Sequence, residues 1–312
     1  MKPTTTRVIL LCALALLPSM KGVPSGKCRA IEVNHGGRER GALLYVPARP
    51  LAGNVPLLLV LHGGGGKGRG MISLTRGRFN ELAERDGFLV AYPDGIGRHW
   101  NDFRDDPIDY AHRNNIDDVG FIRALIDAIA ARHPVDGKRV FATGISNGGF
   151  MCYRLACELG DRIRGVAVVT ANHPEGAKER CRPARPVSVM ILNGTEDPLV
   201  PYHGGHVTVL KRKRGAIVST DETVAFWAGA NACSAAPRRE ALPDADPGDG
   251  TRIERITYRD CGEGTSVILY RIIGGGHTWP GGKPYLSERI VGRVSRDIAA
   301  CDVIWKFFTS ME

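Results

Sequence analysis

Short apolar runs alternate with amphipathic stretches along most of the chain. The apolar runs have the length and residue types of buried strands, and they cover residues 42–46, 56–61, 88–92, 139–143, 166–170, 187–192 and 267–273. The stretches between them carry apolar residues at i, i+3 and i+4, which predicts helices over residues 79–85, 119–132, 149–158, 223–230 and 299–308. This alternation predicts an α/β fold in which helices flank a mostly parallel central sheet, within a single domain.

The amino terminus carries a different pattern. Two basic residues precede an unbroken apolar run over residues 8–17, and small or turn-forming residues follow it. This is the layout of a secretory signal peptide. We therefore predict a signal peptide over residues 1–22 and a catalytic domain over residues 28–312. The run is too short to cross a bilayer, so we expect a protein secreted to the medium or a periplasm, with no membrane association after processing.

Export places the cysteines in an oxidising compartment, where disulfides form. Seven cysteines remain after residues 1–22 are removed, namely Cys28, Cys152, Cys157, Cys181, Cys233, Cys261 and Cys301. An odd number leaves at least one of them free or paired between chains. No two of them have the C-x-x-C spacing, so we expect no zinc site and no other metal. The spacing alone leaves their pairing open.

Two polar segments are predicted to be surface loops. The formal net charge of the full chain is +9, and part of it comes from the basic run 211–214. This run lacks the interleaved aromatic residues of nucleic-acid sites, so we expect a solvated loop and no nucleic-acid partner. The second segment, residues 234–250, is rich in proline, aspartate and glycine, and we expect it to be a long insertion within the domain.

The sequence Gly-Ile-Ser-Asn-Gly over residues 144–148 follows directly on a predicted strand. It matches the G-x-S-x-G elbow, in which a tight strand-to-helix turn lifts a serine clear of the sheet as a nucleophile. In a chain with 39 glycines such a match can arise by chance, but here a strand pattern precedes it and a helical pattern follows. We therefore predict that Ser146 is the nucleophile of a hydrolase.

A run of four glycines follows another predicted strand. Residues 63–66 come after the apolar run 57–61, at the end of the strand where bare backbone amides can converge on a developing negative charge. We predict an oxyanion hole made of the backbone amides of Gly64 and Asn147. A flexible loop and a phosphate-binding loop are the alternatives. The phosphate-binding pattern G-x-x-x-x-G-K-[ST] is not met, because a glycine follows the lysine.

Two further residues complete the chain order of a Ser-Asp-His triad. The predicted strand 187–192 leads into a turn that contains Glu196 and Asp197. The predicted strand 267–273 leads through three glycines to His277. We predict that His277 accepts the proton of the serine and that Asp197 orients the imidazole ring. Glu196 is the alternative acid, and an Asx turn before proline is the alternative role of the aspartate.

Three aromatic residues near these motifs are candidates for the substrate pocket. Trp100, Tyr202 and Trp279 have rings that suit an acyl or aromatic site, although buried aromatic residues are as often part of a core. The predicted chemistry uses no metal and no organic cofactor. Its partner is an ester substrate, which we expect to be oligomeric or small and soluble, because the sequence shows no separate adsorption module.

Taken together, these motifs resemble the polyhydroxybutyrate depolymerase family of α/β-hydrolase esterases, a group that includes feruloyl and acetylxylan esterases. The resemblance covers nearly the whole mature chain, and it rests on residues 61–66, 92–95, 100, 117–121, 144–149, 193–198 and 276–281. It also implies a Cys233–Cys261 disulfide and a Cys157–Cys181 disulfide.

The resemblance implies a secreted serine esterase that acts through an acyl-enzyme on hydroxyalkanoate esters of the polyhydroxybutyrate type. A feruloyl or acetylxylan esterase, acting on esters of plant cell-wall polysaccharides, is the alternative within the family. Two other classes share the fold. A serine peptidase would use the same triad, and a catalytically silent binding protein would be expected to have lost a triad member. The sequence leaves the oligomeric state open.

Overall fold

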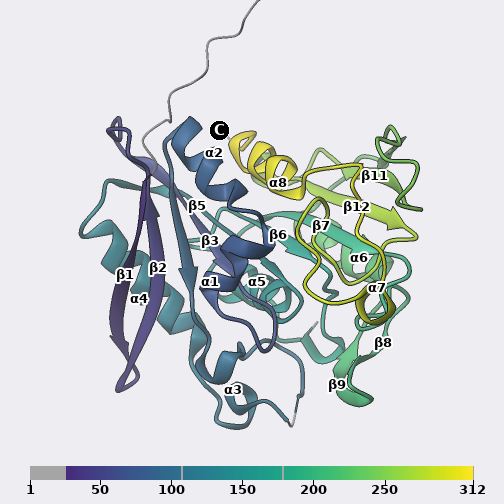
Figure 1. Cartoon of the computed structure of the whole chain (residues 1–312), viewed down its shortest axis with the longest axis horizontal. Coiled ribbons are helices and arrows are strands. Elements are labelled where there is room, and N and C mark those ends of the chain that lie inside the picture. The colour runs from purple at the N-terminus through teal and green to yellow at the C-terminus, as the bar shows by residue number, and fades with distance from the viewer. Residues whose placement is uncertain (1–25, 107, 178, 312) are drawn as a thin grey trace, which may run out of the picture.

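A ten-stranded mixed sheet forms the centre of the computed structural model, which describes residues 26–106, 108–177 and 179–311 (Figure 1). The predicted signal peptide over residues 1–22 lies outside the described residues. The strands follow the order β1-β2-β4-β3-β5-β6-β7-β12-β11-β10. In chain order they are β1 Lys27–His35, β2 Arg38–Val46, β3 Val55–Leu61, β4 Leu89–Pro93, β5 Val135–Ile145, β6 Gly165–Val169, β7 Ser188–Gly194, β10 Arg238–Ala241, β11 Arg252–Tyr258 and β12 Val267–Ile273.

The central part of this sheet is parallel and its two edges are antiparallel. The strands from β4 through β3, β5, β6 and β7 to β12 pair in parallel, whereas β1 and β2 at one edge and β10 and β11 at the other pair antiparallel. The predicted α/β class with a mostly parallel sheet is confirmed. The sequence prediction missed β1, β10 and β11. These edge strands are largely exposed or half-buried, so they lack the continuous apolar runs of the parallel strands.

Helices cover both faces of the sheet (Figure 1). The buried residues of α4 Asp118–Ala130, α5 Asn147–Glu158 and α6 Thr220–Ala230 belong to the core on one face. Those of α1 Gly68–Leu74, α2 Arg78–Asp86 and α8 Ala300–Thr309 belong to the core on the other. The short helices are α3 Tyr110–Arg113, α7 Glu288–Val291, η1 Ile96–Arg98, η2 Glu175–Ala177 and η3 Gly262–Gly264. None of the helices in the described part of the chain has the length and apolar composition needed to cross a membrane.

Strand β3 shows how one apolar run serves both faces. Leu57, Leu59 and Leu61 lie in the core under α4, α5 and α6. Leu58 and Val60 lie in the core under α1, α2 and α8. Successive side chains of a strand point to opposite faces, so a strand covered on both sides needs apolar residues throughout. Strand β3 ends with the last residue of this apolar run, Leu61, and the glycine loop therefore starts at the carboxyl edge of the sheet.

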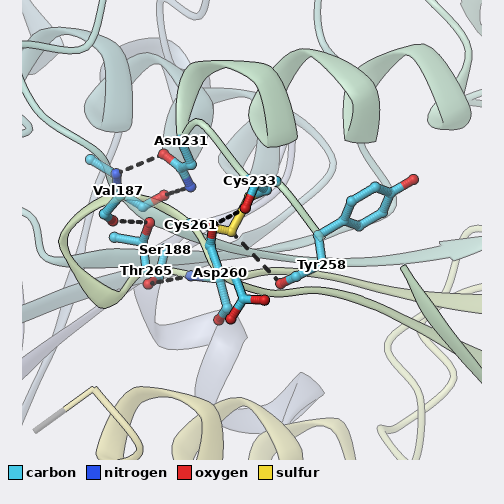
Figure 2. Close-up of a disulfide and its surroundings, with 11 residues drawn as sticks. Val187, Ser188, Asn231, Cys233, Tyr258, Asp260, Cys261 and Thr265 are labelled. Carbon is cyan, nitrogen blue, oxygen red and sulfur yellow. Dashed lines mark hydrogen bonds between the residues drawn. A yellow bond between two sulfur atoms is a disulfide. The ribbon is translucent and has the colours of Figure 1, made fainter. Parts of the chain in front are cut away.

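Two disulfides tie loops to this framework. Cys157 pairs with Cys181 and Cys233 pairs with Cys261, which confirms both pairings that the family resemblance implied. Figure 2 shows the second bond beside Asn231, whose side chain accepts from the backbone N–H of Val187 and donates to its carbonyl. The end of α6 is thereby joined to the start of β7. Within the described chain, the cysteines outside these two bonds are Cys28, Cys152 and Cys301.

The basic run is a β-hairpin rather than a solvated loop, so that prediction is wrong. Strands β8 Gly205–Val209 and β9 Arg212–Ile217 form a separate two-stranded sheet. Arg214 of β9 is mostly buried and forms ion pairs with Asp106 and Asp109, more than one hundred residues earlier in the chain. The carboxylates that neutralise this arginine come from a distant loop, so the local sequence gave no sign of its burial.

Candidate active site

The G-x-S-x-G segment forms a sharp turn between β5 and α5. Strand β5 ends at Ile145 and α5 begins at Asn147, so Ser146 alone makes the connection. Its backbone has φ 55° and ψ −123°. A non-glycine residue with positive φ is strained and persists only where the surrounding structure holds it. The geometry is that of a nucleophile elbow, with the serine at the carboxyl edge of the sheet.

The glycines of the elbow are required by close packing. A Cβ atom on Gly144 would lie 2.6 Å from the carbonyl carbon of Gly148. A Cβ atom on Gly148 would lie 2.5 Å from the carbonyl oxygen of Leu61, at the end of β3. Neither glycine has a positive φ, so a larger residue is excluded here by lack of space and not by backbone conformation. Glycine at both positions lets the first turn of α5 pack directly against β3 and β5.

The loop between β3 and α1 runs beside this turn. A Cβ atom on Gly64 would lie 3.8 Å from the Cβ of Asn147, so the two residues are neighbours. Within the described residues, the backbone N–H groups of Gly64 and Asn147 donate no hydrogen bond to the protein. Two free donors at adjacent positions next to a serine are what an oxyanion hole requires.

His62 fixes the start of this loop. The backbone N–H of Gly95 donates to His62 Nε2 at 3.0 Å, so the ring proton lies on Nδ1, which donates to the carbonyl of Gly63 at 2.8 Å. Burial lowers the pKa of His62, which favours the neutral ring that this arrangement needs. The neutral imidazole therefore acts as a brace for the glycine loop.

A buried histidine–aspartate pair lies near the elbow. His277 Nδ1 is 2.7 Å from Asp197 Oδ2, and both side chains are almost fully buried. The other oxygen, Asp197 Oδ1, accepts from the backbone N–H groups of Leu199 and Val200, each at 2.8 Å. A carboxylate stabilised in this way holds the proton on Nδ1 of the histidine, which leaves Nε2 as its basic nitrogen.

The same geometry separates the two candidate acids. The side chain of Glu196 is 64% exposed and its nearest cation is Arg293, at 3.4 Å. It therefore points to solvent, whereas Asp197 points to His277. The alternative role predicted for Asp197, an Asx turn, is also observed. The same side chain accepts from a backbone N–H two residues later and contacts His277.

Ser146 and His277 line one cavity of about 320 Å³. Part of its wall is aliphatic and comes from α1, the β8–β9 hairpin and the loops after β7 and β12, with Met71, Leu74, Leu199, Val207, Val209 and Leu286. Another part is polar and comes from His99, Arg104, Asp109 and Arg214. Among the described residues no hydrogen bond joins Ser146 to His277; in ligand-free sites such bonds often form only when substrate binds.

The three aromatic residues predicted to bind substrate lie outside the lining of this cavity. Trp100 is fully buried and its Nε1 donates to the carbonyl of His62. The hydroxyl of Tyr202 accepts from Arg271 at 2.7 Å, and Trp279 packs edge-on against Phe79 in the core. The structure therefore gives these three rings no place in the lining of the cavity that contains Ser146. These rings fill space behind the site, and the aliphatic residues that do line it had no local signal to distinguish them from core.

A buried ionic cluster holds the residue after the nucleophile. The side chain of Asn147 donates to Asp102 Oδ2 at 2.7 Å and to the carbonyl of Trp100 at 3.0 Å. Asp102 is in turn paired with Arg104 and His112. Burial would raise the pKa of Asp102, but Arg104 and His112 outweigh it and hold the pKa well below its ordinary value. Sequence reasoning had given Asn147 only a backbone role.

Two groups of side chains have the residue types of metal ligands. Cys157, His173 and Cys181 lie close together, but both cysteines are consumed by their disulfide. Asp106, Asp109 and His112 form the second group. The two carboxylates are paired with Arg214 and the histidine with Asp102. Each member of the second group thus already has an oppositely charged partner where a cation would bind, although Asp109 Oδ2 has no hydrogen-bond partner among the described residues.

Comparisons with known proteins identify relatives that are named esterases. A family model described as esterase PHB depolymerase matches residues 41–173. The putative esterase NocK of Nocardia uniformis subsp. tsuyamanensis is 35% identical over 292 residues, which is 89% of this chain and 81% of that protein. Feruloyl esterase B of Piromyces equi is 33% identical over 65% of this chain. This chain spans only 36% of the length of that relative.

The fold also has a solved counterpart. An acetyl xylan esterase from Aspergillus awamori superimposes with a TM-score of 0.57, over 90% of this chain and 99% of that one. The two sequences are 18% identical, so the likeness concerns the fold alone. It establishes that the sheet and helices described above have the α/β-hydrolase arrangement.

Proposed function

Because this chain belongs to the esterase PHB depolymerase family and is a carboxylic-ester hydrolase, we propose that Ser146, His277 and Asp197 form its catalytic triad. The single observation that carries the proposal is the joint placement of two features in one cavity. These features are the strained serine at the elbow and the histidine whose Nδ1 is bound by a buried aspartate. Each member has the role that the chemistry of ester cleavage requires.

The reaction follows from these roles. His277 Nε2 takes the hydroxyl proton of Ser146 as Oγ attacks the ester carbonyl carbon. The oxyanion of the tetrahedral intermediate accepts from the amides of Gly64 and Asn147. Collapse breaks the bond to the alcohol oxygen, and His277 delivers the proton to the departing alcohol. Water then attacks the acyl-enzyme by the same route, which releases the acid and restores the serine.

For the substrate we propose hydroxyalkanoate esters of the polyhydroxybutyrate type. One part of the cavity wall is formed by aliphatic side chains, and the volume of about 320 Å³ suits a short aliphatic acyl group beside the alcohol portion. The relatives supply the second candidate, a feruloyl or acetylxylan ester, because two of them are named feruloyl esterase B and acetylxylan esterase/xylanase. The lining offers one aromatic ring besides histidine, Tyr285, which favours the aliphatic candidate.

Secretion is part of the proposal. Cys157–Cys181 and Cys233–Cys261 are disulfides, and such bonds persist in oxidising compartments. Together with the amino-terminal pattern of residues 1–22, they support export to an oxidising compartment.

The test is hydrolysis by the purified mature protein of p-nitrophenyl acetate, p-nitrophenyl butyrate, methyl ferulate, acetylated xylan and 3-hydroxybutyrate oligomers. Ser146→Ala is assayed alongside, with Ser234→Ala, an exposed serine outside the cavity, as the matched control. We expect Ser146→Ala to lose at least about 10⁴-fold in kcat while its thermal unfolding stays unchanged, and the control to keep full activity.

The same panel separates the candidates. Preference for hydroxybutyrate oligomers supports the aliphatic substrate, and preference for methyl ferulate or acetylated xylan moves the function to the second candidate. Full activity of Ser146→Ala on any ester contradicts the triad. If the wild-type protein hydrolyses no member of the panel, the proposed substrates are contradicted.

A further inference from the structure

A second histidine–aspartate pair faces the cavity that contains Ser146. His99 follows η1, Asp109 precedes α3, and both line the cavity. His99 Nε2 lies 3.2 Å from Asp109 Oδ1, and its Nδ1 lies 3.1 Å from the carbonyl oxygen of Gly97. The Asp109 side chain is 4% exposed and the His99 side chain 20% exposed. The proposed triad makes no use of either residue.

The contacts of His99 require one proton more than a neutral ring and a carboxylate ion carry together. The carbonyl of Gly97 only accepts, so Nδ1 must carry a hydrogen. A neutral His99 would then turn the lone pair of Nε2 toward an oxygen of Asp109, which repels it when the aspartate is ionised. The contact is therefore favourable when Nε2 also carries a hydrogen, so that an imidazolium lies at ion-pair distance from the carboxylate.

This proton lies beside the glycine loop. A Cβ atom on Gly64 would be 2.9 Å from His99 Nε2 and 3.0 Å from its Cδ2. The imidazole thus packs directly against the residue whose amide is proposed to bind the oxyanion. A positive charge at such a position stabilises the negative charge that develops on a carbonyl oxygen, in a site partly shielded from water.

The surrounding charges determine where the proton resides. From β9, Arg214 contacts Asp109 and Asp106. From the glycine loop, His62 is held neutral by its two backbone bonds, and Lys67 lines the same cavity. The remaining charged groups around the pair are Arg98, which precedes His99, Arg104, which is paired with Asp102, and His112.

Asp109 is only partly compensated within this set. Its Oδ2 is buried and has no hydrogen-bond partner among the described residues. Burial raises the pKa of Asp109 and Asp106 adds to the rise, whereas His99 and Arg214 act in the opposite direction. Arg214 contacts only Oδ1, so a protonated His99 at 3.2 Å supplies part of the compensation that the buried carboxyl lacks.

We propose that His99 and Asp109 hold this proton next to the oxyanion hole, so that the charge of His99 strengthens oxyanion binding when the tetrahedral intermediate forms. The inference rests on the proposed serine-esterase mechanism. His99 is then a supporting residue that acts through the field at the Gly64 amide, and Asp109 is the group that maintains its proton. Loss of the proton at high pH removes this contribution.

The experiment is a pH profile of kcat and KM on p-nitrophenyl butyrate, from about pH 5 to about pH 10, for the wild type, His99→Gln and Asp109→Asn. His206→Gln, an exposed histidine of β8 outside the cavity lining, is the matched control. For the wild type we expect kcat to rise as His277 loses its proton and to fall at higher pH as the pair loses its own.

The two variants have distinct expected profiles. His99→Gln lowers the plateau of kcat roughly tenfold, less than loss of an oxyanion-hole donor, and abolishes the fall at high pH with little change in KM. Asp109→Asn keeps the imidazole but removes its anionic partner, so the fall moves to lower pH. His206→Gln follows the wild-type profile.

A second measurement tests oxyanion binding directly, and thermal unfolding shows whether the variant is folded. An alkyl boronic acid forms a tetrahedral anion on the nucleophilic serine, and we expect its dissociation constant to rise roughly tenfold in His99→Gln that unfolds at the wild-type temperature. A kcat profile and a boronate affinity of His99→Gln equal to those of the wild type overturn the inference. That outcome is distinct from failure of the triad, because Ser146→Ala would still be inactive in the first case and active in the second.

Discussion

The two histidine–aspartate pairs of the cavity are built differently. In the pair His277–Asp197, one carboxylate oxygen binds the imidazole and the other accepts from two backbone N–H groups. In the pair His99–Asp109, one oxygen is shared between the imidazole and Arg214, and the other has no partner among the described residues. The same two side chains thus occur once with a fully satisfied anion and once with a partly satisfied one.

The difference indicates what each pair is suited to do. An aspartate whose two oxygens are both bonded fixes the tautomer of its histidine and leaves Nε2 as a base. A carboxyl group that is buried and incompletely compensated has a raised pKa, and a charged neighbouring ring then stabilises its ionised form. We therefore propose that Asp197 orients the general base His277, and that Asp109 stabilises a positive charge on His99.

The largest expected effect separates the two aspartates. Asp197→Asn should lower kcat by about 10⁴-fold, because an amide that accepts from Leu199 and Val200 presents its NH₂ to His277 and favours the wrong tautomer. Asp109→Asn should change kcat near neutral pH by less than about tenfold. Steady-state kinetics on p-nitrophenyl butyrate measures both. Equal losses in the two variants would contradict the division of roles.

The next effect concerns the buried ionic cluster of Asp102, Arg104 and His112. Asp102→Asn leaves Arg104 buried without its anion and should lower the free energy of unfolding by about 3–5 kcal/mol. Urea unfolding measures it, with Asp136→Asn, an aspartate that the structure leaves much more exposed, as the control. A loss under about 1 kcal/mol would show that the cluster does not stabilise the elbow region.

The same aspartate gives a pH dependence with a defined sign. Its pKa is lower in the folded than in the unfolded protein, so its contribution is present above the unfolded value of about 3.9 and is lost as pH falls from there toward the folded pKa. Wild-type stability should therefore drop below about pH 4, and the drop should be smaller in Asp102→Asn. Unfolding at a series of pH values checks this. An acid dependence that is identical in the two proteins would rule out Asp102 as its source.

A smaller effect is expected between the two pairs, at Gly64. In Gly64→Ala the added methyl group would meet His99 Nε2 at 2.9 Å, so the ring or the glycine loop must shift. We expect kcat to fall by about 10²-fold, comparable to loss of one oxyanion donor. Gly137→Ala, whose Cβ meets open space, is the control. Full kcat in Gly64→Ala would contradict the predicted displacement of the glycine loop and of His99.

The smallest effect is expected on the aliphatic wall. Leu286 is 48% exposed, so Leu286→Ala removes only part of a contact with the acyl group. We expect KM for p-nitrophenyl butyrate to rise a few-fold, KM for the acetate to change less, and the pH profile to stay as in the wild type. A changed pH profile would place Leu286 in contact with one of the two pairs and weaken the comparison.

Much of the fold followed from local patterns. The buried parallel strands are continuous apolar runs, and the strand before Ser146 and the helix after it lie where the sequence predicted them. The edge strands did not follow, because β1 and β10 are exposed over most of their length and resemble loops in composition. The hairpin that contains Arg214 was missed for a related reason, since its stability depends on carboxylates from another segment.

The site divides in the same way. Ser146, Asp197 and His277 stand in motifs with glycines whose spacing is tied to backbone geometry, and the structure brings His277 and Asp197 into contact and places Ser146 in the same cavity. Their catalytic roles remain proposals. The prediction for Trp100, Tyr202 and Trp279 rests on side-chain type alone, and each of them fills space or binds a polar partner elsewhere.

The sequence by itself determined the order of the elements, the glycines that permit the elbow and the chain order of serine, aspartate and histidine. These features depend on local sterics and on hydrophobic periodicity, which neighbouring residues encode. Only the tertiary structure decided which residues line the cavity, that Asp197 rather than Glu196 reaches His277, and that His99 meets Asp109 beside Gly64. Burial and ion pairing are set by segments far apart in the chain, so no local pattern records them.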